Sequence, residues 1–207
     1  MIVAVTGNTG SGKTEVAERF VRWGGRLIDA DRIGRAVWEE DPLVRSEIVR
    51  ELGADVVGAD GEIDRARLGA AVFGDPRKLA AFDRIVQPRL RARMADEILR
   101  ARREPETTWV LDAALLFEWG LEGQVDLVVA VTAPEEIRAA RIAGRHGLSA
   151  EESNRRVASQ SREGEKARRA DRVIVNDGSL RDLDKKARAL WDEIEGGTGR
   201  RPQGEES

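Results

Sequence analysis

Near its start the chain reads Gly7-Asn8-Thr9-Gly10-Ser11-Gly12-Lys13-Thr14, a stretch that matches the pattern G-x-x-x-x-G-K-[ST] at every fixed position. Residues 2–6, which precede it, form a short apolar run that is typical of a buried strand. Residues 15–23, which follow it, place apolar side chains on one side at helical spacing. A strand, a glycine-rich loop and a helix in this order are the context that a phosphate-binding loop requires.

The chemistry of such a loop is anion binding. Glycines allow successive backbone N–H groups to converge on phosphate oxygens, and the N-terminus of the following helix adds a partial positive charge. Lys13 would reach the outer phosphates, and the Thr14 hydroxyl would bind Mg²⁺. The alternative is a glycine-rich turn that only joins strand to helix, with Lys13 in solvent. We expect the loop to bind a nucleoside triphosphate through Gly7, Gly10, Ser11, Gly12, Lys13 and Thr14.

The composition is that of a soluble globular protein. The 207 residues, 41% hydrophobic and 35% charged, are enough for one sizeable α/β domain with inserted subdomains. No apolar run approaches the roughly twenty residues that span a bilayer, and no export signal is visible, so we expect no membrane partner and a cytoplasmic location. The absence of cysteine excludes disulfides, thiolate zinc sites and a cysteine nucleophile. The net charge of −3 gives no reason to expect nucleic-acid binding.

Strand patterns alternate with helical patterns along the chain, which indicates a mostly parallel sheet covered on both faces. A final helix, introduced by Ser179 and Asp182, would place Leu180 and Trp191 on one apolar face. The expected strands are residues 2–6, 26–31, 107–112, 125–131 and 171–175. We therefore predict an α/β protein, a P-loop NTPase three-layer fold with a mostly parallel five-stranded sheet.

Residues 36–90 contain helical patterns but no strong strand, which indicates a helical insertion. Its last helix opens at Asp75-Pro76, and we expect Gln87-Pro88 to interrupt that helix because an interior proline removes a hydrogen bond. Two helices in residues 135–169 are placed to form a helical lid. The expected organisation is a core of 1–35, 91–134 and 170–195, a substrate-binding insertion of 36–90, the lid of 135–169 and a disordered tail of 196–207.

Two aspartates follow strands at the edge where open α/β sheets bind ligands. Asp31, at the end of the second expected strand, could accept a proton from an attacking hydroxyl or hold Mg²⁺ through water, and its alternative role is a helix N-cap. Asp112 ends the third strand and resembles the acid that assists Mg²⁺ in many phosphate-loop proteins. The alternative for Asp112 is a turn residue at a strand end, and the sequence leaves both readings open.

The expected lid is rich in arginine. Part of this stretch is a solvated helical face, because acidic residues are mixed into it. Arginines that reach a transferring phosphoryl group stabilise its charge, so we expect at least one of them to be functional.

These motifs together resemble the dephospho-CoA kinase family from Ile2 to about Ile194. The phosphate loop alone is shared by many enzymes, but the ordered combination is specific. The matching stretches are Val5 to Thr14, Ile28-Asp29-Ala30-Asp31-Arg32-Ile33, Asp60 to Arg65, Leu115-Leu116-Phe117-Glu118, Arg141 with Arg145, Arg156-Val157-Ala158-Ser159-Gln160 and Ala170 to Asn176.

The resemblance implies ATP-dependent phosphorylation of the ribose 3′-hydroxyl of dephospho-CoA, which makes the enzyme a phosphotransferase with an alcohol group as acceptor. It implies that Asp31 is the general base for that hydroxyl and that Lys13 and Thr14 bind the phosphates and Mg²⁺. It also implies that Arg141 is a catalytic arginine of the lid. The resemblance further implies that Arg145 and Asn176 bind ATP, with Asn176 near the adenine. The residues that it implies bind dephospho-CoA are Asp31, Gln87, Leu115, Glu118, Arg156 and Gln160.

This sequence departs from the family pattern at three places. Gln87 stands where the family usually has histidine, and glutamine can hydrogen-bond but cannot become a cation. Asn8-Thr9 stands where the loop often reads Gly-Ile, and Ala114 replaces a proline.

Two alternatives to a dephospho-CoA kinase stay open. One is another small-molecule kinase of the same fold, acting on a nucleotide or nucleoside. The other is a non-catalytic nucleotide-binding switch, although the Asn-Lys-x-Asp segment usual in guanine-specific switches does not occur here. We expect a monomer or a weak homo-oligomer.

Overall fold

The structure is a computed structural model that describes residues 1–158, 160 and 163–197, apart from the side chains of Phe73, His146 and Glu163. From residue 198 onward, the expected disordered tail lies outside the described residues. The chain divides into two compact units, the first comprising Met1–Asp29 and Ile98–Ser207 and the second Ala30–Glu97. Within the described ranges, no helix is long and apolar enough to cross a membrane.

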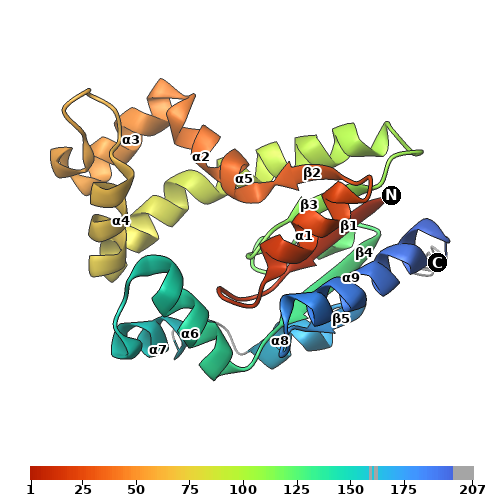
Figure 1. Cartoon of the computed structure of the whole chain (residues 1–207). Helices are drawn as coiled ribbons and strands as arrows, with labels where there is room; N and C mark the ends of the chain where they lie inside the picture. Colours follow the sequence, from red (N-terminus) through yellow and green to blue (C-terminus); the bar gives the residue numbers. More distant parts are fainter. Residues whose placement is uncertain (159, 161–162, 198–207) are drawn as a thin grey trace. The chain divides into compact units, whose positions relative to one another are not determined.

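The first unit is built on a five-stranded sheet in the order β2-β3-β1-β4-β5, in which every neighbouring pair is parallel (Figure 1). The expected α/β fold is confirmed, with a sheet that is wholly rather than mostly parallel. Four strands, all except β1, start or end one or two residues away from the expected positions. The strands are β1 (Ile2–Thr6), β2 (Arg26–Asp29), β3 (Trp109–Asp112), β4 (Leu127–Thr132) and β5 (Arg172–Val175).

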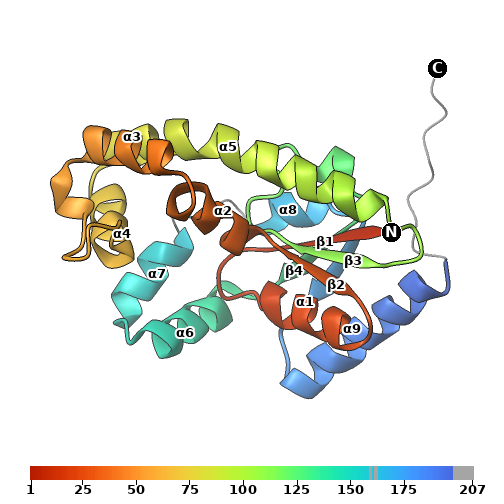
Figure 2. The same ribbon diagram turned by 90° about the horizontal axis from the view of Figure 1, so that it is seen from above.

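Helices α1 (Lys13–Arg22) and α9 (Leu180–Glu195) lie side by side on one face of the sheet, as Figure 2 shows from above. Alternate residues of β1, β3 and β4 meet them in one apolar core, where the rings of Phe20 and Trp191 are 5.1 Å apart. The residues between them, such as Ala4 and Leu111, are also buried, so the sheet is covered on both faces. The remaining helices of this unit are α6 (Glu135–His146), α7 (Ala150–Ala158), α8 (Glu163–Arg169) and the 3₁₀ turn η2 (Glu122–Gln124).

Local capping fixes the start of α9. Ser179 and Asp182 form a capping box in which each side chain accepts from the other residue's backbone N–H. Hydrogen bonds from the hydroxyl and the N–H of Ser179 lower the pKa of the Asp182 carboxyl. The capping box therefore stabilises the folded protein above the usual aspartate pKa, and this stabilisation is lost as the pH falls through the lowered pKa. Leu180 is 65% exposed, which corrects its expected inward position: the buried stripe begins one turn later, at Leu183.

The second unit is helical, as the sequence pattern predicts. Asp41 caps α3 by accepting from the N–H groups of Leu43 and Val44, and Trp38 packs edge-on against Phe82. Its elements are α2 (Ala30–Glu39), α3 (Pro42–Leu52), the 3₁₀ turn η1 (Ala54–Val56), α4 (Arg65–Gly74) and α5 (Pro76–Arg102), whose last residues, from Ile98 on, belong to the first unit.

The expected interruption of α5 at Pro88 is wrong. The helix runs unbroken through 27 residues with Pro88 inside it. Apolar side chains on both sides of the proline, including Ile85, Leu90 and Met94, are buried at helical spacing. Their burial outweighs the hydrogen bond that proline cannot make to the carbonyl of Arg84, so tertiary packing overrides the local signal.

We expect Pro88→Ala to raise the free energy of unfolding by about 2 kcal/mol, because it restores a helical N–H and removes the ring from an exposed helix interior. Urea unfolding followed by circular dichroism measures the change. Pro76→Ala is the matched control, since proline is favoured at the first helical position and its loss should bring no gain. An unchanged or lower stability of Pro88→Ala would contradict the prediction.

Candidate active site

The phosphate loop connects β1 to α1, with Gly12 as the N-cap residue of the helix in a left-handed conformation at φ 94°. A Cβ on Gly12 would lie 2.3 Å from Nδ2 of Asn176, so only glycine fits at this position. Because the N-cap carries no side chain, the first N–H groups of α1 remain available to an anion. The loop therefore has the geometry of a phosphate site.

Asp112, at the end of β3, meets two side chains of the loop. Its Oδ1 atom lies 2.7 Å from Nζ of Lys13, and its Oδ2 atom accepts a hydrogen bond of 2.9 Å from the Thr14 hydroxyl. The strand register explains this meeting, because Asp112 pairs with Val5 of β1 just before the loop begins. Of the two readings that the sequence leaves open, this geometry favours a functional acid.

Asp112 and Thr14 fit a magnesium ion that arrives with a nucleotide. Both offer hard oxygen atoms. The Thr14 hydroxyl donates its proton to Asp112 and accepts only a long hydrogen bond of 3.4 Å from Nζ of Lys13, so its oxygen could still serve a cation. Among the residues that the structure describes, no group of three or more His, Cys, Asp or Glu side chains could hold a metal by itself. Such a sparse donor set suits Mg²⁺, which keeps waters and phosphate oxygens among its ligands.

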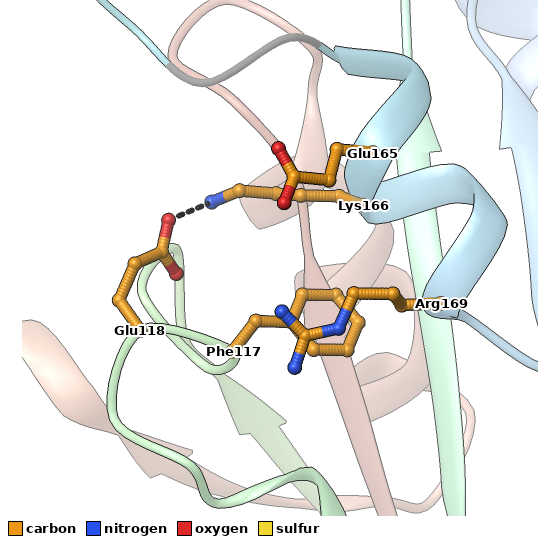
Figure 3. Close-up of a pocket in the computed structure, with 5 residues that line it drawn as sticks. All are labelled: Phe117, Glu118, Glu165, Lys166 and Arg169. Carbon is orange, nitrogen blue, oxygen red and sulfur yellow. Dashed lines mark ion pairs between the residues drawn. The ribbon is translucent and has the colours of Figure 1, made fainter.

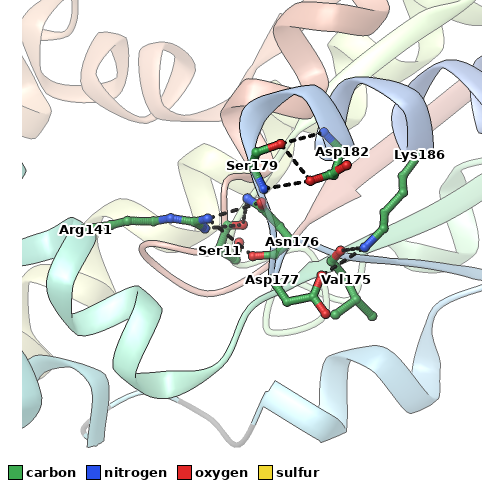
Figure 4. A network of polar contacts seen from close by, with 8 residues as sticks. All are labelled: Ser11, Arg141, Val175, Asn176, Asp177, Ser179, Asp182 and Lys186. Carbon is green, nitrogen blue, oxygen red and sulfur yellow. Dashed lines mark hydrogen bonds and ion pairs between the residues drawn. The ribbon is translucent and has the colours of Figure 1, made fainter.

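Arg141 reaches from α6 to the loop and to Asn176, the residue after β5 (Figure 4). Its Nη1 atom donates to the carbonyls of Gly10 at 3.1 Å and Ser11 at 3.4 Å. Its Nη2 atom donates to both oxygens of Asn176, at 3.3 and 3.2 Å. The amide of Asn176 in turn donates to the Ser11 carbonyl at 2.8 Å. These contacts place a fixed cation beside the loop.

The other residues expected from the resemblance are spread over the first unit. Arg145 follows Arg141 by one turn of α6 and is exposed, and Arg156 is exposed on α7. Leu115 is 42% exposed in the segment after β3. Gln160 lies against the phosphate loop, where its Oε1 atom accepts from the N–H of Thr9.

Glu118 forms an ion pair of 3.1 Å with Lys166 of α8, at one wall of a pocket of about 150 Å³ (Figure 3). Lys166 is 5% exposed and also donates to the carbonyl of Ala114. Arg169 covers the ring of Phe117 at 4.2 Å on the other side of this pocket. Lys166 thus joins α8 to the segment that the resemblance assigns to the substrate.

Lys166 and Arg138, both buried, belong to the basic residues of the expected lid, but the sequence gives neither of them an individual role. Both stand in an arginine-rich stretch that reads as a solvated helical face. A signal for Lys166 was present, since it is one of only five lysines in a chain whose basic residues are nearly all arginine.

Asp31 and Gln87 belong to the second unit. The expected position of Asp31 at a strand end is wrong: β2 stops at Asp29 and α2 starts at Ala30, so Asp31 is the second residue of that helix. It is therefore neither a strand-end residue nor the N-cap, although an acid in the first turn suits the helix dipole. Its side chain is exposed, and Gln87 is half-buried on α5.

Residues 1–182 match the family model described as dephospho-CoA kinase. The dephospho-CoA kinase of Symbiobacterium thermophilum is 41% identical over 201 residues, which cover 97% of this chain and 84% of that protein. The solved dephospho-CoA kinase from Campylobacter jejuni is 25% identical with a TM-score of 0.72, covering 95% of this chain and 98% of that one. A crystal structure from Thermus thermophilus is 36% identical with a TM-score of 0.75, covering 94% and 97%.

We expect Asp112→Asn to weaken the binding of Mg²⁺–ADP by about tenfold or more, because the amide cannot supply a charged ligand. Metal-free ADP should bind at least as tightly as before, since Lys13 is released from its ion pair. Calorimetric titration with and without Mg²⁺ measures both affinities.

Asp192→Asn, on the exposed face of α9, is the control and should change neither affinity. An equal loss of affinity for the two forms of ADP in Asp112→Asn would argue against a metal role.

Proposed function

The chain belongs to the dephospho-CoA kinase family, and from this membership we propose how its residues transfer a phosphoryl group from ATP to the ribose 3′-hydroxyl of dephospho-CoA. The observation that carries the proposal is the meeting of Asp112 with Lys13 and Thr14 at the phosphate loop. This arrangement provides a cation for phosphate oxygens and two oxygen ligands for a metal, which are the parts that phosphoryl transfer requires.

On the donor side, the N–H groups of the first turn of α1, together with loop N–H groups other than those of Thr9 and Ser11, would bind the phosphates of ATP. Lys13 would neutralise the outer phosphate oxygens, while Thr14 and Asp112 would hold Mg²⁺. When bound, the ion neutralises charge that develops on the phosphates during transfer.

Two arginines and an amide complete the proposed ATP site. Arg141 would hold positive charge beside the loop, and its contacts to neutral oxygens leave that charge available to an anion. Arg145, one turn later on α6, would reach the phosphates, and Asn176 would lie near adenine.

On the acceptor side, Asp31 would accept the proton of the 3′-hydroxyl. The hydroxyl oxygen then bonds to the γ-phosphorus of ATP as ADP leaves. The residues proposed to bind dephospho-CoA with it are Gln87, Leu115, Glu118, Arg156 and Gln160. Glutamine at position 87 would hydrogen-bond the substrate without adding a charge.

The proposed organisation has a nucleotide-binding core of 1–35, 91–134 and 170–195, a substrate domain of 36–90 and a lid of 135–169. We further propose a cytoplasmic enzyme, monomeric or weakly oligomeric, with no nucleic-acid or membrane partner.

The substrate is tested directly by ATP consumption with dephospho-CoA as acceptor. We expect kcat/KM for dephospho-CoA to exceed that for adenosine and for nucleoside monophosphates by at least about a hundredfold, because only the former fits the whole acceptor site. Equal turnover of a nucleoside monophosphate would favour the alternative, a different small-molecule kinase. ATP binding without any transfer would favour a nucleotide-dependent switch.

We expect Asp31→Asn to lower kcat by roughly two orders of magnitude or more, because the amide cannot accept the proton, while Mg²⁺–ATP binds with nearly normal affinity. Steady-state kinetics and a nucleotide titration measure the two effects. The control Asp55→Asn removes an exposed carboxylate from the same unit and should leave kcat unchanged. Normal turnover by Asp31→Asn would show that Asp31 contributes only to the first turn of α2.

A further inference from the structure

Both backbone polar groups of Thr9, at the tip of the phosphate loop, are held by side chains from distant parts of the first unit. Nε of Arg138 donates to the Thr9 carbonyl at 3.1 Å, and the Thr9 N–H donates to Oε1 of Gln160 at 3.0 Å. Nη2 of Arg138 donates to the same Oε1 atom at 2.8 Å. The three hydrogen bonds form a closed ring, which we call the Thr9 clamp.

Arg138 is buried to an extent that is unusual for a charged side chain, with 1% of it exposed. A guanidinium in such a place is tolerated only when its donors are satisfied, so its position is tightly determined by its acceptors. The backbone of α6 is also close, because a Cβ on Gly10 would lie 2.8 Å from the Arg138 carbonyl. The start of α6 is therefore packed directly against the loop.

The clamp and one bond within the loop together occupy two N–H groups that precede Gly12. The Thr9 N–H is bonded to Gln160, and the Ser11 N–H donates to the Asn8 carbonyl at 3.0 Å. These bonds fix the turn that precedes Gly12 and the start of α1. Contacts from the protein alone therefore support this conformation of the loop.

We propose that Arg138 and Gln160 are positioning residues that preorganise the phosphate loop for ATP. A loop that is already ordered loses less conformational entropy when it binds a ligand, so the clamp raises the affinity for nucleotide. This inference rests on the proposed function and deepens it. It gives the side-chain oxygen of Gln160 a task on the donor side, whereas the resemblance assigns this residue to the acceptor.

The test compares donor and acceptor parameters in Gln160→Met, which keeps the length of the side chain but removes the acceptor oxygen. We expect Kd for Mg²⁺–ADP and KM for ATP to rise about tenfold, and to rise by more than KM for dephospho-CoA does. A rise confined to KM for dephospho-CoA, or an unchanged Kd for Mg²⁺–ADP, would overturn the proposal.

Variants of Arg138 provide an independent arm of the test. Arg138→Met should raise Kd for Mg²⁺–ADP as Gln160→Met does, and Arg138→Lys, which retains a donor, should recover part of the affinity. The double variant, with Arg138→Met and Gln160→Met together, should bind Mg²⁺–ADP no more weakly than the single variant of lower affinity. The reason is that either substitution alone already breaks the same ring of hydrogen bonds. Fully additive losses would overturn the clamp, and Gln160→Met keeps the test valid if Arg138→Met fails to fold.

Arg155→Met, which removes an exposed arginine from α7, is the matched control and should leave Kd for Mg²⁺–ADP unchanged. The two proposals fail in different ways. If the wild-type protein does not phosphorylate dephospho-CoA, the proposed function fails, while the nucleotide titrations still decide whether the clamp exists.

Discussion

A loop that turns its N–H groups toward a phosphate turns carbonyl groups outward, and those carbonyls need donors of their own. In this protein the carbonyls of residues 9–11 are satisfied by Arg138, Arg141 and Asn176. The donors come from α6 and from the end of β5, more than a hundred residues after the loop. The inner, anion-binding surface therefore depends on an outer shell that the later half of the chain supplies.

The sheet was predictable because its signals are local. Strands β1 and β4 are buried on both faces and therefore read as continuous apolar runs, which also indicate a parallel sheet. The capping box at Ser179 and the glycine pattern of the loop are short motifs whose geometry needs no distant partner. These features were sufficient for the fold class, and they also predict which residues form the donor half of the site.

The rest depends on contacts that sequence spacing does not contain. Arg138 lies in a stretch with the pattern of a solvated helix, and its partner Thr9 is 129 positions away. The functional reading of Asp112 required the register that sets β3 beside β1. Pro88 carries a true helix-breaking signal, but the burial of its apolar neighbours outweighs it.

The strand order has a consequence for how the chain folds. β1 is the first strand of the chain but the central one of the sheet, and its two neighbours begin only at Trp109 and Leu127. During synthesis one edge of β1 stays unpaired until β3 has left the ribosome and the other until β4 has, while Ala30–Glu97, one continuous piece of chain, can collapse earlier from local contacts. The helical unit thus matures first, and the nucleotide site is completed last.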